Sequence, residues 1–286
     1  MKLALATQPE SYSELVVRSL KLYRQTLGPS FLLAFLVAVI VFIPRLICVA
    51  VGQNVFLTTK HWGQQQLLFI TIYMSSLWFY GALLWGIHCI QQLGKREHFI
   101  AEIKAAGKRM LYVFGAAFIL ILIGMLTLLI DRPLHYVFLE IMQLNLHRYV
   151  FAVLMFTLIA IRASIPLLIF LLFYFYFPLI IVESDGIFLA LKQSATLVWG
   201  HVCRTLKLIL TPWLCYLIVL ILIKMVFKIN FHVFFMPFEL ISDLPTAAFN
   251  ILILAFFIPW TGALMLVQLK DLELRKKAVR KKNDPH

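Results

Sequence analysis

Six long apolar segments constrain what this chain of 286 residues can fold into. Each is long enough to cross the roughly 30 Å hydrocarbon core of a bilayer as a helix, which takes about 20 residues. The segments are 30–51, 67–90, 111–130, 149–182, 205–227 and 247–269. Because they are continuous rather than alternating, they argue against a β-barrel and predict an all-α, polytopic membrane protein with six transmembrane helices. We treat residues 1–286 as a single integral membrane domain.

Composition agrees with this class. Hydrophobic residues make up 62% of the chain, against about 45–50% in soluble domains. A soluble protein of this size lacks the interior to bury so much apolar surface. The four cysteines have no CxxC spacing, so neither a zinc site nor a disulfide framework is expected.

The distribution of positive charge predicts the orientation. Nineteen Lys and Arg residues fall in the N-terminal segment, the second and fourth loops, and Lys270 with the basic tail 271–286, against four in the other loops. Cytoplasmic loops collect Lys and Arg, so both termini are expected in the cytoplasm. The same rule accounts for the net charge of +13, and no nucleic-acid partner is predicted.

The fourth apolar segment is too long for one crossing, since its 34 residues would extend about 50 Å as a helix. Ser164 and Pro166 resemble a helix start, with serine as the cap and proline in the first turn. We therefore expect a break there, which places Arg162 at the outer interface. The alternative is one tilted helix kinked at Pro166, which would bury Arg162 in the membrane as a functional residue. With Pro259, which also bends a predicted span, these residues form the candidate functional set Arg162, Pro166 and Pro259.

Three amphipathic segments, 11–24, 95–112 and 186–200, run directly into spans, and we call them the surface helices. Their apolar residues recur at spacings of three and four, which marks one helix face. We expect them to lie flat on the inner leaflet, with the lipid bilayer and its anionic lipids as partners. The basic residues assigned to this contact are Arg18, Lys21, Arg24, Lys104, Lys108, Arg109, Lys192, Arg204 and Lys207.

The surface helices also fall in register. Ser19, Gly107 and Ser194 are 88 and 87 residues apart. This spacing predicts three repeats of surface helix, span, loop and span, bounded by 11–93, 95–182 and 186–270. The six spans would then form three helical hairpins.

A family resemblance rests on the segments 177–183 and 19–24 and on a motif that follows the fourth span. The motif residues are Ala190, Leu191, Ser194, Leu197, Gly200 and Arg204. The chain resembles the YciC-type inner-membrane proteins and the membrane domain found beside some glycerophosphodiester phosphodiesterases. The resemblance implies a six-span, multi-pass protein of the bacterial inner (cytoplasmic) membrane with no assigned catalytic residues. No soluble phosphodiesterase domain is present in the sequence, so that activity is not carried over.

The spans carry little reactive chemistry. No Asp or Glu lies well inside them, and HExxH, Walker and GxGxxG motifs are absent from the sequence. Paired polar residues are the usual mark of intramembrane chemistry. We therefore expect no enzymatic activity, cofactor or metal. The leading hypothesis is a role in envelope or lipid organisation or as an accessory to a membrane protein partner. The alternative is a transporter or exporter of a lipidic or hydrophobic solute.

Overall fold

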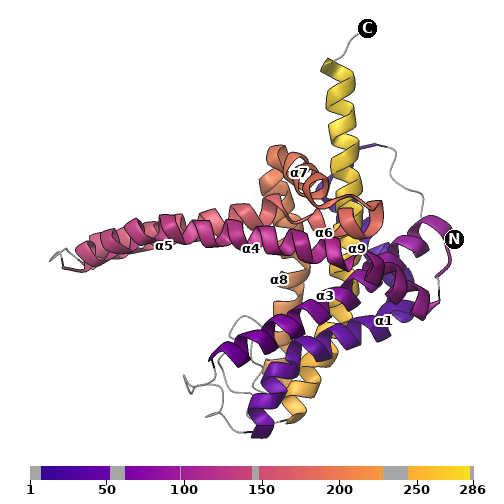
Figure 1. Ribbon diagram of the computed structural model, residues 1–286, viewed down its shortest axis with the longest axis horizontal. Coiled ribbons are helices and arrows are strands. Elements are labelled where there is room, and N and C mark those ends of the chain that lie inside the picture. The colour runs from indigo at the N-terminus through magenta and orange to yellow at the C-terminus, as the bar shows by residue number, and fades with distance from the viewer. Residues whose placement is uncertain (1–7, 52–61, 97, 144–147, 228–243, 284–286) are drawn as a thin grey trace.

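The computed structural model describes residues 8–51, 62–96, 98–143, 148–227 and 244–283. Within these ranges every regular element is a helix (Figure 1), which confirms the all-α prediction. The helices are α1 (Tyr12–Val51), α3 (Trp62–Leu93), α4 (Phe99–Gln143), α5 (Arg148–Leu172), α6 (Tyr176–Pro178), the π-helix η2 (Leu179–Glu183), α7 (Ile187–Val198), the 3-10 helix η3 (Trp199–His201), α8 (Val202–Phe227) and α9 (Leu244–Asn283).

Five helical stretches are long and apolar enough to cross a membrane. They are Tyr12–Ile43, Phe99–Thr127, Tyr149–Glu183, Ile187–Ile223 and Ala248–Ala278. α3 holds the predicted span 67–90 but is not among these five. Its described part mixes apolar residues with serines, tyrosines and tryptophans. The helical, apolar character of the chain is thus confirmed, and the count of six spans stays a prediction.

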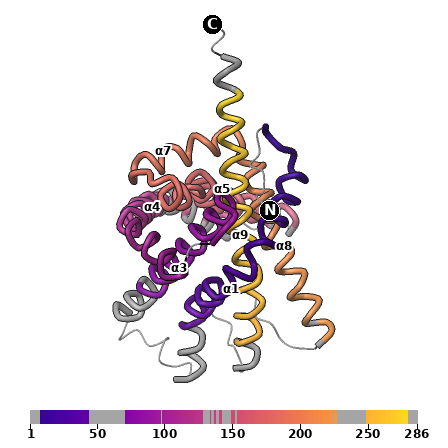
Figure 2. Tube along the Cα trace, turned by 90° about the vertical axis from the view of Figure 1, so that its right-hand side faces the viewer, coloured from indigo at the N-terminus to yellow at the C-terminus, as the bar shows by residue number. Residues whose placement is uncertain are grey.

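α9 lies at the centre of the bundle. In its most apolar window, 78% of the residues are buried inside the protein, and α1, α3 and α8 pack against it (Figures 1 and 2). Gly262 brings α9 close to α3, because a Cβ atom there would lie 3.1 Å from the side chains of Leu83, Leu84 and Ile87. Small residues allow helix backbones this close an approach.

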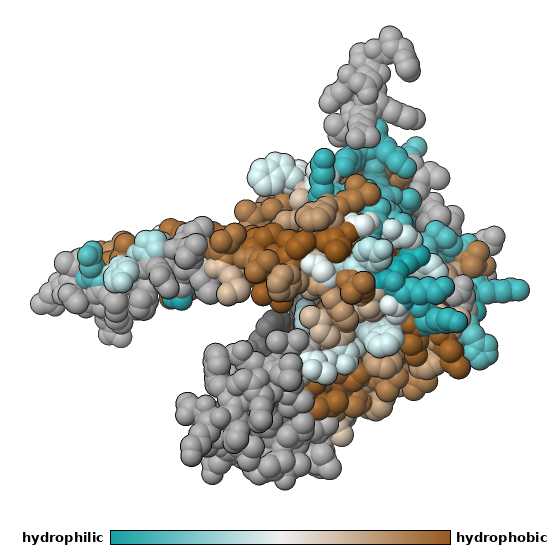
Figure 3. All heavy atoms as spheres, viewed as in Figure 1, coloured by the Kyte–Doolittle hydropathy of each residue, from teal (hydrophilic) through white to brown (hydrophobic). Residues whose placement is uncertain are grey.

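α4 and α5 lie side by side and extend away from the other helices as a two-helix arm (Figure 1). Large apolar side chains on the arm are exposed, including Phe118, Met125, Phe156 and Ile159. Hydrophobic residues cover much of its visible face (Figure 3). Apolar surface of this extent marks a contact with a membrane or another protein.

The surface helices are helical as predicted, but two of them are not separate elements. The segment 11–24 opens α1, and 99–112 opens α4, and both helices continue without interruption into their apolar parts. The third surface helix forms α7, which is separated from α8 by the short η3. Each buries part of its apolar face, as Leu15, Met110 and Leu197 show.

The predicted break at Ser164–Pro166 is wrong. α5 passes through both residues and ends at Leu172, and a turn at 173–175 leads into α6. The Ser164 hydroxyl donates to the Ile161 carbonyl, 2.7 Å away, in the preceding turn of the same helix. It therefore does not cap a new helix. Pro166 removes one backbone donor, a loss that apolar helices tolerate.

Candidate functional site: the charged end of the bundle

Hydrophilic residues gather at one end of the bundle, around the C-terminal half of α9 (Figure 3), and several of them form ion pairs there. We call this region the charged end and define it by Glu10, Glu102, Arg109, Arg204 and Asp271, with the residues that contact them. It joins the surface helices to the ends of α3, η2 and α9.

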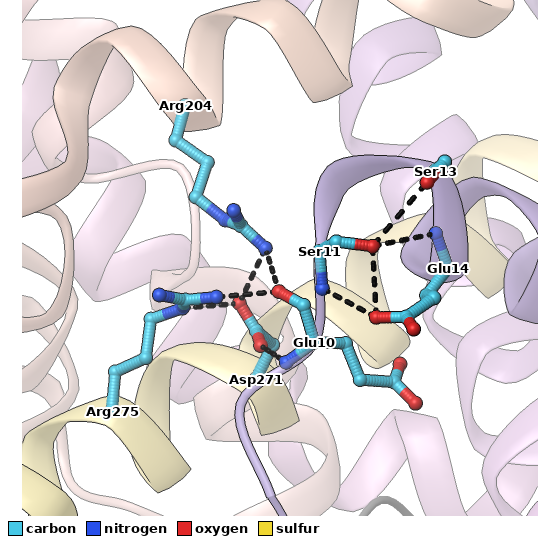
Figure 4. Close-up of polar contacts among 7 residues, drawn as sticks. All are labelled: Glu10, Ser11, Ser13, Glu14, Arg204, Asp271 and Arg275. Carbon is cyan, nitrogen blue, oxygen red and sulfur yellow. Dashed lines mark hydrogen bonds and ion pairs between the residues drawn. The ribbon is translucent and has the colours of Figure 1, made fainter.

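Asp271 of α9 forms the centre of a polar cluster, and its side chain is completely buried (Figure 4). Its carboxylate accepts hydrogen bonds from the Glu10 backbone N–H at 2.8 Å, from Arg275 Nε at 2.9 Å and from Arg204 Nη2 at 3.2 Å. Both guanidinium groups also donate to the Glu10 carbonyl. One buried carboxylate thus ties the N-terminal segment and α8 to α9.

The start of α1 is fixed next to this cluster. The Ser11 hydroxyl accepts from the Glu14 backbone N–H at 3.4 Å, and the Glu14 carboxylate accepts from the Ser11 N–H at 2.7 Å. This reciprocal pair is a capping box, which satisfies two backbone donors at a helix N-terminus. Arg18, one turn later, pairs with the Glu10 carboxylate.

A second buried carboxylate lies at the junction of α3 and α4. Arg96 holds Glu102 with two hydrogen bonds, Nε to Oε1 and Nη2 to Oε2, each 2.7 Å long. The Glu102 side chain is fully buried. It packs directly on Gly86 of α3, where an added Cβ would lie 2.7 Å from Glu102 Oε1. Only glycine leaves room for the carboxylate.

Arg109 of α4 joins the arm to η2. Its guanidinium donates to the Ile181 carbonyl and lies 4.8 Å from the centroid of the Trp85 ring. Arginine suits this position because its planar group can stack on an aromatic face while donating a hydrogen bond. η2 ends at Glu183, and the next residue, Ser184, has a positive φ of 63°.

Ser194, a motif residue of α7, forms hydrogen bonds with backbone groups at the end of α5. Its hydroxyl accepts from the Phe175 N–H at 3.0 Å and donates to the Leu172 carbonyl at 2.8 Å. Helix ends leave backbone groups without intrahelical partners, and one buried side chain satisfies two of them here. Of the other motif residues, Ala190, Leu191 and Leu197 are buried beside it, and Gly200 is exposed in η3.

We expect Ser194→Ala to destabilise the protein by about 1–3 kcal/mol, because it leaves buried polar groups without a partner. Amide exchange at Phe175 should accelerate, and thermal unfolding in detergent should begin at a lower temperature. Ser75→Ala is the matched control, since the Ser75 hydroxyl donates only to the Thr71 carbonyl within α3. Unchanged exchange at Phe175 in Ser194→Ala would contradict this role.

A polar cavity of about 160 Å³ lies between α3, η2 and α9. Glu183 and Glu273 both line this cavity, and Lys270 Nζ lies 2.8 Å from Glu273 Oε2. His88, Gln91 and Gln92 complete its polar lining. Beside it, burial and the negative charge of Glu273 raise the pKa of Asp185. Within the described ranges, no group of three or more His, Cys, Asp or Glu residues could hold a metal ion.

The nine basic residues predicted to contact the membrane divide into two groups. Arg18, Arg109 and Arg204 are partly buried and contact other parts of the protein, as described above. The remaining six side chains are exposed: Lys21, Arg24, Lys104, Lys108, Lys192 and Lys207. Arginine is the better residue for pairing with carbonyl and carboxylate groups inside a protein, and lysine is strongly hydrated.

The three candidate functional residues do not form one site. Arg162 is exposed on α5, and Pro259 is buried inside α9. Pro166 lines a second cavity, which is apolar and lies between α3, α4, α5, α6 and α9. The structure therefore does not bring the three together at a polar cavity.

Sequence reasoning missed the acidic partners Glu10, Glu102 and Asp271. A usable indication was present, because each acid lies in or beside a surface helix or just beyond an apolar segment. At such a position a lone carboxylate beside several arginines favours ion pairing. The partners themselves could not be identified, since Glu10 and Asp271 are 261 residues apart.

Comparison of the chain with known protein families, with curated proteins and with solved structures finds no match.

Proposed function

We propose that this chain is a multi-pass protein of the bacterial inner membrane, without enzymatic activity, that organises lipid or envelope components or supports a membrane protein partner. In this proposal the charged end sits at the inner leaflet and the exposed lysines contact anionic lipid headgroups. The observation that most directly supports this proposal is the combination of exposed cations with exposed apolar side chains on the surface helices.

That combination occurs on all three surface helices. Leu20 and Lys21 are adjacent and exposed on α1. On α4, the Ile100 and Leu111 side chains are 71% and 78% exposed on the helix that also presents Lys104 and Lys108. On α7 and η3 the exposed apolar and basic residues are Phe188, Leu189, Lys192 and Trp199. Cations beside aromatic and aliphatic residues are the composition that binds the headgroup region.

The contacts between the two ends of the chain support the proposed topology. Glu10, which precedes α1, bonds to Asp271 and Arg275 in the last helix. An even number of crossings places both ends on one side of a membrane, as six spans require. The excess of Lys and Arg in the same segments favours the cytoplasmic side.

The absence of paired acids and nucleophile motifs in the apolar segments of the sequence is the reason for proposing a non-enzymatic role. The resemblance of the 177–204 region to YciC-type proteins agrees with this role. The motif residue Ser194 has a structural role, because its hydroxyl forms hydrogen bonds with backbone groups where α5 ends.

The proposal predicts that neutralising Lys104, Lys108 and Lys192 together to glutamine weakens the preference of the protein for anionic lipid. Each lysine near an anionic surface contributes on the order of 1 kcal/mol, so the preference for phosphatidylglycerol over phosphatidylcholine should fall about fivefold for each lysine neutralised. Spin-labelled lipids in vesicles containing the purified protein measure this ratio directly.

The triple arginine variant at the same positions is the matched control, because it keeps the charge and should keep the preference. High salt should lower the preference of the original chain in the same direction. An unchanged lipid ratio in the glutamine variant would refute the assigned membrane contact.

One observation favours the alternative function, transport of a lipidic or hydrophobic solute. The cavity at Pro166 is lined largely by aromatic side chains and lies next to the turn at 173–175. Interrupted helices beside a cavity are a recurring feature of transporter binding sites. Uptake or release of an apolar solute by vesicles containing the protein would distinguish transport from a static role.

A further inference from the structure

The aromatic cavity beside Pro166 has the features of a ligand site. Its volume is about 330 Å³, at the lower end of the range of about 300–1,000 Å³ for small-molecule pockets. Most of its lining is apolar or aromatic, and five hydroxyl groups lie among these residues. They belong to Tyr73, Tyr80, Thr127, Tyr174 and Tyr176. Apolar walls with a few polar groups that fix orientation are typical of such pockets.

The position of the cavity along the chain indicates where a ligand comes from. Every lining residue falls inside an apolar segment that the sequence predicts to cross the membrane: 67–90, 111–130, 149–182 or 247–269. The cavity is only partly enclosed and opens to the surroundings of the protein. At that depth the surroundings are hydrocarbon, so the available ligand is an aliphatic chain.

The turn that ends α5 supplies polar backbone groups beside the cavity. The Tyr174 N–H donates to the Leu171 carbonyl at 3.2 Å instead of to that of Phe170, four residues earlier. Pro178 has no N–H to donate to the Tyr174 carbonyl. Phe170 and Tyr174 both line the cavity, and their carbonyls have lost the usual helical donors. Carbonyls released from a helix are effective binding groups inside a membrane.

We propose that this cavity binds one aliphatic chain carrying a polar carboxyl or ester end, which hydrogen-bonds to the tyrosine hydroxyls at the helix interruption. A free fatty acid also offers a hydroxyl to the freed carbonyls of Phe170 and Tyr174. The site rests on the proposed membrane placement and adds to it a specific lipid-chain pocket. It lies apart from the exposed lysines, so the two contacts can be tested separately.

Gly124 of α4 allows the cavity to be filled without disturbing its walls. It lines the cavity, and a Cβ atom there would meet nothing within 4 Å. Gly124→Leu should therefore occupy the space. Gly28→Leu is the matched control, because Gly28 is also helical with nothing within 4 Å, and it is exposed away from the cavity.

The experiment uses the full chain in vesicles of phosphatidylethanolamine and phosphatidylglycerol. One arm contains phosphatidylglycerol with a diazirine on an acyl chain, and the other contains a free fatty acid with the same diazirine. After illumination, mass spectrometry compares labelling of residues 166–177 with labelling of the exposed residues Ile218 and Leu222 on α8. We expect stronger labelling at the cavity, a loss of about tenfold in Gly124→Leu, and no loss in Gly28→Leu.

Each outcome decides the matter. Labelling by one arm alone supports the site and identifies a phospholipid or a free acid as the source of the chain. Cavity labelling no stronger than on α8, in the original chain, overturns the site even if Gly124→Leu does not fold. Labelling of the cavity that persists in folded Gly124→Leu also overturns it. If α8 is not labelled either, the membrane placement fails together with the site.

Discussion

An Asp271→Ala variant is expected to lose about 3–5 kcal/mol of folding stability, the range for removing one partner of a buried ion pair. The carboxylate is fully buried and accepts from Arg204, Arg275 and the Glu10 backbone. Its removal leaves two guanidinium groups facing each other without the intervening negative charge. Unfolding of the purified protein by sodium dodecyl sulfate, followed by tryptophan fluorescence, measures the loss.

Two further variants separate charge from shape. Asp271→Asn keeps an acceptor for the Glu10 N–H and removes the charge, so its stability should fall between those of Asp271→Ala and the original chain. Lys277→Ala changes an exposed residue of the same helix and should stay within about 0.5 kcal/mol of the original. Equal stability of Asp271→Ala and Lys277→Ala would show that the cluster does not hold the bundle together.

The second large effect is expected for Gly86→Ala, in which one added methyl group should lower the folding stability by about 2–4 kcal/mol. The Cβ of alanine would lie 2.7 Å from Oε1 and 2.9 Å from Cδ of Glu102. The carboxylate must then move away from Arg96, which holds it at two points. Breaking a buried pair in this way leaves a charge without its partner, which is the main source of the cost.

Gly124→Ala is the matched control, because the same methyl group meets nothing within 4 Å there. Alanine in a helix interior is favoured over glycine by about 0.5–1 kcal/mol, so this control should be neutral or slightly stabilising. Opposite signs for the two glycine variants, measured by the same unfolding assay, are the expected result. A stabilised Gly86→Ala variant would mean that α3 and α4 are farther apart than described.

The helices could be predicted from the sequence because runs of apolar residues are a local property. All six predicted segments lie in helical elements, and the last helix, α9, continues through the basic tail to Asn283. The interruption of the fourth segment was misplaced for a physical reason. Ser164 and Pro166 carry a local pattern for a helix start, whereas the real turn at 173–175 depends on Ser194, which lies in the next helix.

The charged end could be predicted only in part. The basic faces of the surface helices follow from helical periodicity, and six of the nine assigned cations are exposed. Which arginines turn inward depends on acids elsewhere in the chain, as the pairing of Arg204 with Asp271 shows. Contacts over such separations leave no mark in a single sequence.

The three-copy repeat stays a prediction, but the register residues occupy comparable positions. The Ser19 hydroxyl accepts from the Trp260 indole N–H at 3.2 Å. Gly107 lies against the Trp78 ring, and Ser194 bonds to the turn after α5. In each case a small residue admits a neighbouring helix or turn to the surface helix. Small size at these positions is therefore explained by packing alone.

The cluster around Asp271 also bears on how the chain is assembled during synthesis. Glu10 is synthesised 261 residues before its partner Asp271. The central helix α9 is likewise synthesised after α1, α3 and α8, which pack against it. These three helices can therefore complete their packing only once α9 has been made.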